Sequence, residues 1–473
     1  MNLPVTAAAL PARRIDAAGK PHVDLRTILK LAAPLMATNA VQALLNLTDL
    51  WFIGRLSTDA VAAMGAIYWI MSCAILLFGG VGLAVQTFVA QAFGSRRKAR
   101  ASRALWNALW ASLALLPVFV TLAFAGPLIL HPFGLDRHIE QLALEYWMPR
   151  MGGAFLGSMA WAAMGFFNGI SAIRFTMAIV VTTTIVNAFA NQYFIFGLGL
   201  GMKGSAWATN FAQFTGTALA LVLFLRGETG RLYRSKLMWR PHWRVIRAQL
   251  MVGLPIGVMY GADVLGLALS QMMIAQSSAV GAAATQIVMA LTSMAYMPTI
   301  GIALAGTTLV GQSIGAGSRD WANRMGNVVI VLCAGFMAFI AVVLLVVGPW
   351  LLPLFVSAGG PAAAEVVALG LILLWPAAAY QIFDGLYCGA SFCLRGAGDT
   401  RVPAATALVL SWFFFVPLAH TLVFAPGAGW FDGLPQYGLG AKGGWLALMS
   451  YVILLGMSMF WRWHHGAWRA VRI

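Results

Sequence analysis

The stretch RGETGRLYRSKLMWRPHWRVIR, residues 226–247, is a polar and strongly basic segment that separates two long apolar regions of the chain. Each region contains apolar segments long enough to cross the ~30 Å hydrocarbon core of a bilayer as a helix. The predicted spans lie at 28–53, 60–93, 104–130, 142–167, 175–198 and 204–225, and then at 248–276, 281–314, 325–354, 363–394, 402–425 and 443–463. The sequence therefore predicts an all-α membrane protein with twelve transmembrane helices, six in each half.

The composition supports a membrane protein. Of the 473 residues, 61% are apolar and only 9% are charged, whereas soluble domains have about a quarter of their residues charged. The net charge of +16 would suggest nucleic-acid binding in a soluble protein, but here the basic residues cluster between apolar segments. All but five of the 30 Lys and Arg lie in the termini, the linker or loops on the same side. The positive-inside rule then predicts that both termini are cytoplasmic, and no nucleic-acid partner is expected.

The two halves also resemble each other in sequence. VAQAFG at 89–94 matches LVGQSIG at 309–315, and FNGISAIR at 167–174 matches LRGAGDTR at 394–401. Because six spans is an even number, both halves enter the membrane from the same face, so the repeat is parallel. Transporters built from such repeats bind substrate between the two halves near the midplane.

This repeat divides the chain into parts. The expected parts are a cytoplasmic N-terminal tail (1–27), an N-lobe (28–225), the basic cytoplasmic linker (226–247), a C-lobe (248–465) and a cytoplasmic C-terminal tail (466–473). The loop between the tenth and eleventh spans is expected to hold Arg395 and Arg401 on the cytoplasmic side. Arg150 is then the one basic residue placed inside a span and away from the span ends.

Three carboxylates lie well inside predicted spans. The chain has 14 Asp and Glu, and all but Asp49, Asp263 and Asp384 fall in tails, loops or span ends. An ionised side chain at the centre of a transmembrane helix costs about 2.5–3.5 kcal/mol on insertion scales. Such residues usually mark an ion or substrate pathway, so we interpret these three as candidate binding residues.

Polar side chains share helix faces with these acids. The sets spaced by three or four residues are Gln42, Asn46 and Asp49; Asn187 and Asn191; Thr209 and Gln213; Tyr260 and Asp263; and Tyr380 and Asp384. They predict one polar cluster in each half. The alternative is that these groups only hold helices together by hydrogen bonds, as Asn, Gln and Thr often do in bilayers.

Sequence motifs for enzyme chemistry are missing. The sequence contains no Walker-type phosphate loop, HExxH, GxSxG or dinucleotide fingerprint, so an ATP-driven pump or a hydrolase is not indicated. The four cysteines show no metal-ligand spacing and are interpreted as packing residues. No cofactor is expected. A membrane-embedded enzyme would need a catalytic constellation at one depth, and none is visible.

Several segments together resemble the multidrug and toxic compound extrusion (MATE) family. The main ones are TDLWFIGRLSTDAVAA (48–63), TTIVNAFANQYFIFGLGLGMKGSAWAT (183–209) and YQIFDGLYCGASFCLRGAGDT (380–400). The resemblance implies a V-shaped pair of six-helix bundles that acts as an antiporter in the bacterial cytoplasmic (inner) membrane. It implies small, mostly cationic amphiphilic substrates, exchanged for Na⁺ or H⁺, and a monomer in the lipid bilayer.

The resemblance also implies roles for individual residues. An N-lobe cation site would consist of Asp49, Asn187, Asn191 and Thr209, and the NorM-like bacterial branch implies a C-lobe site of Asp263, Tyr380 and Asp384. Gln42, Asn46, Gln213 and Tyr260 would support these sites as further polar residues on the same helix faces. Position 263 is Asp where that branch usually has Glu, and position 191 is Asn where another branch has Asp. The sequence therefore leaves both Na⁺ and H⁺ open as the coupling ion.

One alternative function stays open at this point. A flippase for a lipid-linked precursor, from a related fold group, would favour a groove lined with Arg and Lys to hold phosphates. The spans hold three carboxylates against Arg150 alone, so we expect a negative cavity that favours cations over anions.

Overall fold

The computed structural model describes residues 10–16, 19–355 and 362–472, so parts of both predicted tails (1–9, 17–18 and 473) lie outside the described residues. The helices of the first half are α1 (Leu25–Gly54), α2 (Thr58–Gly94), α3 (Lys98–Ala114), α4 (Leu116–Phe124), α5 (Gly126–Leu130), α6 (Arg137–Gly152), α7 (Ala154–Gly169), α8 (Ile173–Asn191) and α9 (Gly201–Leu225). The linker forms α10 (Gly227–Leu232). The second half contains α11 (Trp243–Ser277), α12 (Ala279–Gly315), α13 (Arg319–Leu351), α14 (Ala363–Ala397), α15 (Arg401–Val409), α16 (Val416–Val423) and α17 (Gly440–His464).

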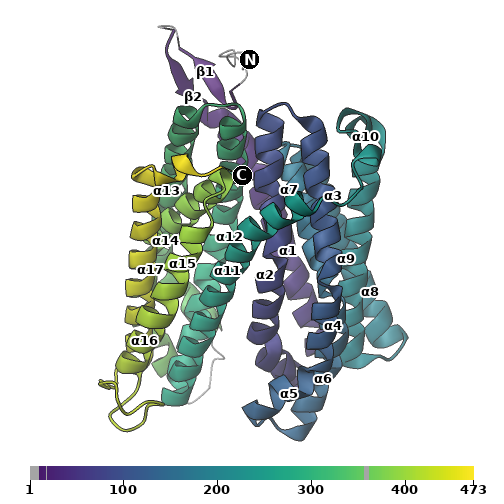
Figure 1. Ribbon diagram of the computed structural model, residues 1–473. Helices are drawn as coiled ribbons and strands as arrows, with labels where there is room; N and C mark the ends of the chain where they lie inside the picture. Colours follow the sequence, from purple (N-terminus) through teal and green to yellow (C-terminus); the bar gives the residue numbers. More distant parts are fainter. Residues whose placement is uncertain (1–9, 17–18, 356–361, 473) are drawn as a thin grey trace.

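The predicted all-α membrane fold is confirmed, with the helices gathered into two bundles that lie side by side (Figure 1). Among the described residues, eleven helices are long and apolar enough to cross a membrane. The predicted span at 142–167 is not one of them, because it is divided between α6 and α7, which have 16 residues each. The twelfth crossing is therefore a broken helix rather than a continuous one.

The break between α6 and α7 has a local cause. Pro149 has no N–H for the helical ladder, which weakens the last turn of α6. The Asn210 side chain of α9 fills the break, since its Nδ2 donates to the Pro149 carbonyl (2.6 Å) and its Oδ1 accepts from Arg150 (3.3 Å). A Cβ at Gly153 would lie 2.2 Å from the Asn210 amide, so glycine is needed there.

The two lobes are joined at one end by hydrogen bonds that repeat from lobe to lobe. Four side chains donate to backbone carbonyls across the interface: Thr87 to Arg395 (2.9 Å), Gln91 to Gly396 (3.1 Å), Thr308 to Asn168 (3.1 Å) and Gln312 to Gly169 (2.9 Å). Donors and acceptors occupy equivalent positions in the two repeats, with each Thr one helical turn before its Gln. We call Thr87, Gln91, Thr308 and Gln312 the reciprocal latch.

The ends of α2 and α12 meet beside the reciprocal latch through backbone contact. A Cβ at Gly94 would lie 2.0 Å from the Gln312 carbonyl oxygen, and a Cβ at Gly315 would lie 2.1 Å from that of Gln91. A backbone atom cannot move aside as a flexible side chain can, so both positions require glycine. The lobes are therefore in close contact at this end.

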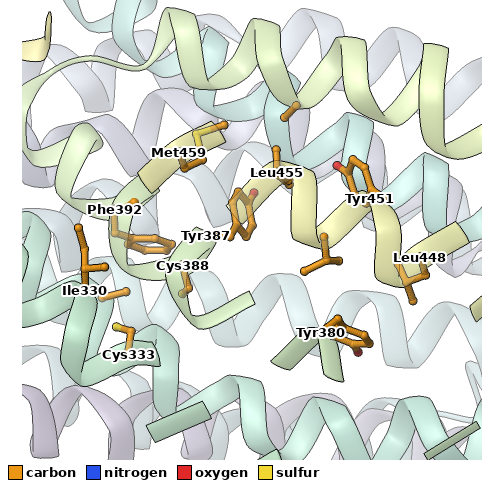
Figure 2. Close-up of a cluster of buried hydrophobic side chains, with 14 of the residues drawn as sticks. Ile330, Cys333, Tyr380, Tyr387, Cys388, Phe392, Leu448, Tyr451, Leu455 and Met459 are labelled. Atoms are coloured by element: carbon orange, nitrogen blue, oxygen red, sulfur yellow. The ribbon is translucent and has the colours of Figure 1, made fainter. Parts of the chain in front are cut away.

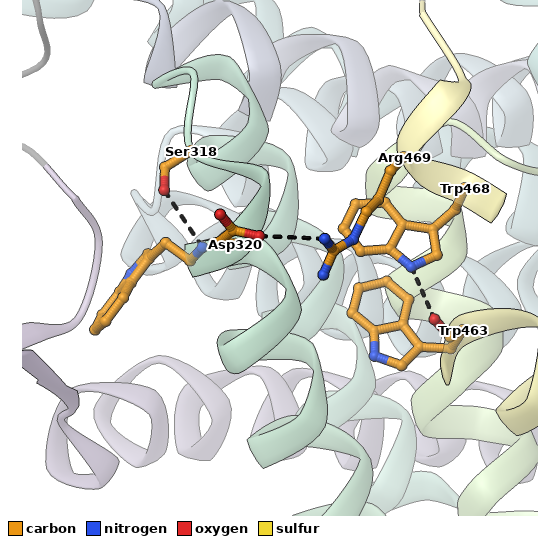
Figure 3. A network of polar contacts seen from close by, with 6 residues as sticks. Ser318, Asp320, Trp463, Trp468 and Arg469 are labelled. Atoms are coloured by element: carbon orange, nitrogen blue, oxygen red, sulfur yellow. Dashed lines mark hydrogen bonds and ion pairs between the residues drawn. The ribbon is translucent and has the colours of Figure 1, made fainter. Parts of the chain in front are cut away.

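Both described ends of the chain pack at the same end of the molecule as the latch (Figure 1). The hairpin of β1 (Arg13–Ile15) and β2 (Pro21–Val23) precedes α1, and Trp321 at the start of α13 donates to the Pro11 carbonyl (2.9 Å) beside it. Arg469, near the C-terminus, pairs with Asp320 at 3.2 Å, and the Trp463 and Trp468 rings stack 4.5 Å apart (Figure 3). Both terminal segments thus contact the C-lobe through the start of α13.

Candidate functional site

The N-lobe acid lies where three helices meet. Asp49 of α1 is buried, and its Oδ1 accepts from the side-chain amides of Asn187 (3.0 Å) and Asn191 (2.7 Å) on α8. Its Oδ2 accepts from the Thr209 hydroxyl of α9 (3.1 Å). The structure thus brings together all four residues assigned to the N-lobe site.

The surroundings of this carboxylate contain both spare acceptors and a basic residue. The amide oxygens of Asn187 and Asn191 are buried and have no hydrogen-bond partner among the described residues. Carboxylate, amide and hydroxyl oxygens are the ligands that hard cations prefer. The buried Arg150 of α6 lies within electrostatic reach of Asp49 and offsets part of its charge.

The other polar residues of the N-lobe do not join this site. Gln42 lines a pocket between the lobes, and Asn46 is exposed. The spacing of three or four residues places Gln42 and Asn46 on the same face of α1 as Asp49. However, Gln42 lies about 10 Å from Asp49 along the helix axis. Gln213 has a buried Oε1 without a partner among the described residues, and it faces Gly157 of α7.

The C-lobe contains two carboxylates with a different set of neighbours. Asp263 of α11 accepts from the hydroxyls of Tyr387 on α14 (2.9 Å) and Tyr451 on α17 (2.5 Å). Asp384 of α14 lies within electrostatic reach of Asp263, and both are half-buried. No basic side chain of the described residues adds to the field at either one. Two carboxyl groups therefore share this site.

Three tyrosines surround the two C-lobe acids. Tyr380 lies near Asp384, interacts with Thr292 and stacks on Trp445 with 6.3 Å between the ring centroids. The described hydrogen bonds to Asp263 come from Tyr387 and Tyr451 instead. Figure 2 shows Tyr380, Tyr387 and Tyr451 among the buried apolar side chains of α14 and α17. Sequence reasoning missed Tyr387 and Tyr451. The first could have been found, because it follows Asp384 by three residues on the same helix face.

Arg395 occupies a position that the sequence did not suggest. Its assignment to a cytoplasmic loop is wrong, because it lies in the last turn of α14 with only 4% of its surface exposed. Its guanidinium donates to the Leu83 carbonyl of α2 and interacts with Tyr260. Tyr260 therefore contacts Arg395, rather than acting only beside Asp263 as expected.

These two residues line a pocket between the lobes. The pocket has a volume of about 170 Å³ and is lined by side chains of α1, α2, α7, α8, α11, α12 and α14, among them Gln42, Trp161, Tyr260 and Arg395. The expectation that Arg150 is the one basic residue within the spans is therefore corrected. A second buried guanidinium lies at the interface of the lobes.

Comparison with known proteins gives a consistent result. The MatE family model matches residues 34–193 and 255–421. The chain is 32% identical to a probable multidrug resistance protein NorM from Burkholderia pseudomallei, over 92% of this chain and 91% of that protein. It is 30% identical to a protein of the same description from Pseudomonas aeruginosa, over 93% of this chain and 90% of that one.

Solved structures share the fold. One is described as the outward-facing conformation of a multidrug resistance MATE family transporter of the MOP superfamily, with a TM-score of 0.79 and 20% identity over 94% of this chain and 96% of that one. Another is a crystal structure of MATE in the straight conformation, with a TM-score of 0.80 and 19% identity over the same shares of the two chains.

Proposed function

Since the chain belongs to the MatE family of transporters, we propose that it is a secondary antiporter that exports organic cations in exchange for Na⁺ or H⁺. Family membership makes it a multidrug-type transporter rather than an enzyme. The proposed location is the bacterial cytoplasmic membrane, with both termini in the cytoplasm, because the basic residues gather at the end that carries them.

The observation that carries this proposal is a carboxylate site inside each lobe, buried in the N-lobe and half-buried in the C-lobe. Asp49 lies in the N-lobe, and Asp263 lies near Asp384 in the C-lobe. An antiporter needs only that the cation and the substrate bind with different affinities to its two states. Buried carboxylates supply this, because their charge must be balanced by one positive ligand or the other.

The C-lobe pair favours a small cation in particular. Two like charges in a medium of low dielectric repel each other, and a bound Na⁺ or H⁺ relieves that repulsion. In the N-lobe the spare oxygens of Asn187 and Asn191, together with Asp49, form a set that suits a hard cation. Both lobes are therefore proposed as cation sites.

The reciprocal latch supports alternating access. It joins the lobes at the end proposed to face the cytoplasm, so the path between them is closed on that side in this structure. Opening to the cytoplasm would break the four latch bonds as the lobes rock apart. Because both sites and the interface lie within one chain, we propose that a monomer performs the cycle.

The flippase alternative finds less support. A groove for the phosphates of a lipid-linked precursor would need several basic residues facing it. Among the described residues that line the pocket between the lobes, Arg395 is the one basic side chain.

Dye transport in proteoliposomes tests the proposal. Ethidium and an anionic dye of similar size should be compared in the same vesicles under an imposed Na⁺ or H⁺ gradient. Ethidium is expected to be transported and the anionic dye is not, because the two sites hold three carboxylates. Equal transport of both dyes would mean that the carboxylates do not face the substrate path.

A further inference from the structure

Arg395 carries a buried positive charge without a negative partner among the described residues. Its hydrogen bond to the Leu83 carbonyl, the face of the Phe392 ring 5.5 Å from its guanidinium carbon and the Tyr260 side chain are all neutral contacts. None of the ion pairs between described residues includes it. Its Nε is buried and has no hydrogen-bond partner in the part of the chain that the structure describes.

Such an arrangement leaves room for an acceptor. A guanidinium has five N–H donors in a planar fork that matches the two oxygens of a carboxylate. A buried charge that lacks a counter-charge is costly, so a ligand that supplies one binds favourably. The Arg395 side chain is 4% exposed and lines the pocket between the lobes, so a ligand would reach it there.

The shape of the pocket indicates what carries the charge. Its volume of about 170 Å³ is close to the ~150 Å³ of a cavity that accepts one benzene ring. Trp161 and Phe392 give it aromatic walls, and Asn39 and Asn168 add polar groups. A phosphate headgroup would call for further basic residues, whereas a carboxylate on one aromatic ring needs a single guanidinium.

We propose that Arg395 and this pocket form a binding subsite for the aromatic carboxylate of a transported amphiphile. This rests on the proposed function and narrows it. The protein would prefer zwitterionic substrates, whose cationic group is attracted by the buried acids while the carboxylate pairs with Arg395. Purely cationic substrates would still bind, but without this ion pair.

Two dyes that differ at one group provide the test. Rhodamine 110 has a free aromatic carboxylate, and rhodamine 123 is its methyl ester. Binding to the purified full-length protein in phosphatidylcholine nanodiscs should be measured by fluorescence anisotropy. Wild type should bind rhodamine 110 more tightly. Arg395→Gln should weaken rhodamine 110 binding by about tenfold to a hundredfold and leave rhodamine 123 within about twofold.

The matched control is Arg401→Gln, which removes the same charge six residues away at an exposed position of α15. It should leave the preference for rhodamine 110 unchanged. A second measurement needs no variant: benzoate should displace rhodamine 110 from wild type, whereas benzamide and inorganic phosphate should not. Nanodiscs that contain phosphatidylglycerol should give the same dye affinity as those without it.

Several results would overturn this subsite. The first is that wild type binds the two dyes with equal affinity, and the second is that Arg395→Gln loses affinity for both dyes equally. The third is that inorganic phosphate displaces rhodamine 110 as well as benzoate does. The fourth is that phosphatidylglycerol in the nanodisc weakens binding of rhodamine 110. If these occur while ethidium is still exported, the subsite is wrong and the antiporter stands. If the protein binds rhodamine 110 more tightly than rhodamine 123 but a cation gradient does not drive ethidium transport, the subsite stands and the proposed antiport is wrong.

Discussion

The two lobes repeat the same order of helices, yet their buried acids have different surroundings. In the N-lobe, Asp49 receives three hydrogen bonds from neutral side chains and has Arg150 nearby. In the C-lobe, Asp263 receives two tyrosine hydroxyls and lies near a second carboxylate, Asp384. Arg150 thus offsets part of the charge of the N-lobe acid, whereas the C-lobe site brings two carboxyl groups together. We infer that the C-lobe attracts the coupling cation more strongly.

The largest effect is expected for Asp49→Asn. This change removes the only acid among the hydrogen-bonded residues of the N-lobe site and leaves the buried Arg150 without the nearby opposite charge, so the site no longer attracts cations. Dye efflux from cells should be abolished while the protein still inserts into the membrane. Asn46→Ala, at an exposed position of the same helix, is the matched control and should transport normally. Near-wild-type resistance at equal membrane levels of Asp49→Asn would refute this.

The next effect concerns the C-lobe pair. Asp263→Asn and Asp384→Asn should each reduce gradient-driven transport by about tenfold or more, and the double variant should lose little more, because groups that act as one unit are not additive. Transport rates in proteoliposomes would show this. If the two losses multiply, the two acids do not share one cation.

A smaller effect is expected for the hydroxyl donors. Tyr387→Phe and Tyr451→Phe each remove one hydrogen bond to Asp263 but keep the ring in the apolar cluster of Figure 2. A hydrogen bond to a charged group contributes about 1.5–3 kcal/mol, so the apparent affinity for the coupling cation should change by about tenfold to a hundredfold while transport continues. Thr209→Val is the corresponding change in the N-lobe. A loss as large as that of Asp263→Asn would make these tyrosines part of the cation site itself.

The smallest effects should come from the reciprocal latch, where the lobes are equivalent. Gln91→Ala removes one bond to a backbone carbonyl, and Gln312→Ala removes one such bond and a second bond to the Ser171 hydroxyl. Each bond contributes about 0.5–1.5 kcal/mol, so the closed population should shift by about twofold to tenfold in Gln91→Ala and by at least as much in Gln312→Ala. Distances between spin labels on α2 and α12 would report the shift. Gln286→Ala, at an exposed position of α12, should cause none. A clearly larger shift for Gln91→Ala than for Gln312→Ala would mean that the lobes do not open symmetrically.

Much of the fold could be predicted from the sequence because it depends on local properties. The length of an apolar segment decides whether it spans the bilayer, and a buried acid such as Asp49 is conspicuous in such a segment. The split at Gly153 was missed because proline alone does not divide a helix, as Pro34 in α1 shows, and the break after Pro149 also depends on Asn210 from another helix. Tyr451 gave no signal within its own span, since its partner Asp263 belongs to α11.

Arg395 shows another limit of sequence reasoning. Counting basic residues between spans predicts the side of the membrane on which they lie, but it treats each one as solvated. Here the side chain turns into the interface and bonds to the Leu83 carbonyl of the other lobe. That contact depends on how the two bundles pack, which no local pattern encodes.

The difference between the lobes leads to one decisive measurement. Wild type and Asp384→Asn should be reconstituted into proteoliposomes, and a Na⁺ or H⁺ gradient should be imposed. For each protein, the accumulation of ethidium driven by the gradient should be compared with the downhill exchange of ethidium. Wild type is expected to accumulate ethidium until the gradient is dissipated. Asp384→Asn should keep exchange but lose accumulation, because the cation no longer finds two carboxylates. Full accumulation by Asp384→Asn, or accumulation by wild type after both gradients are dissipated, would contradict coupling through the C-lobe.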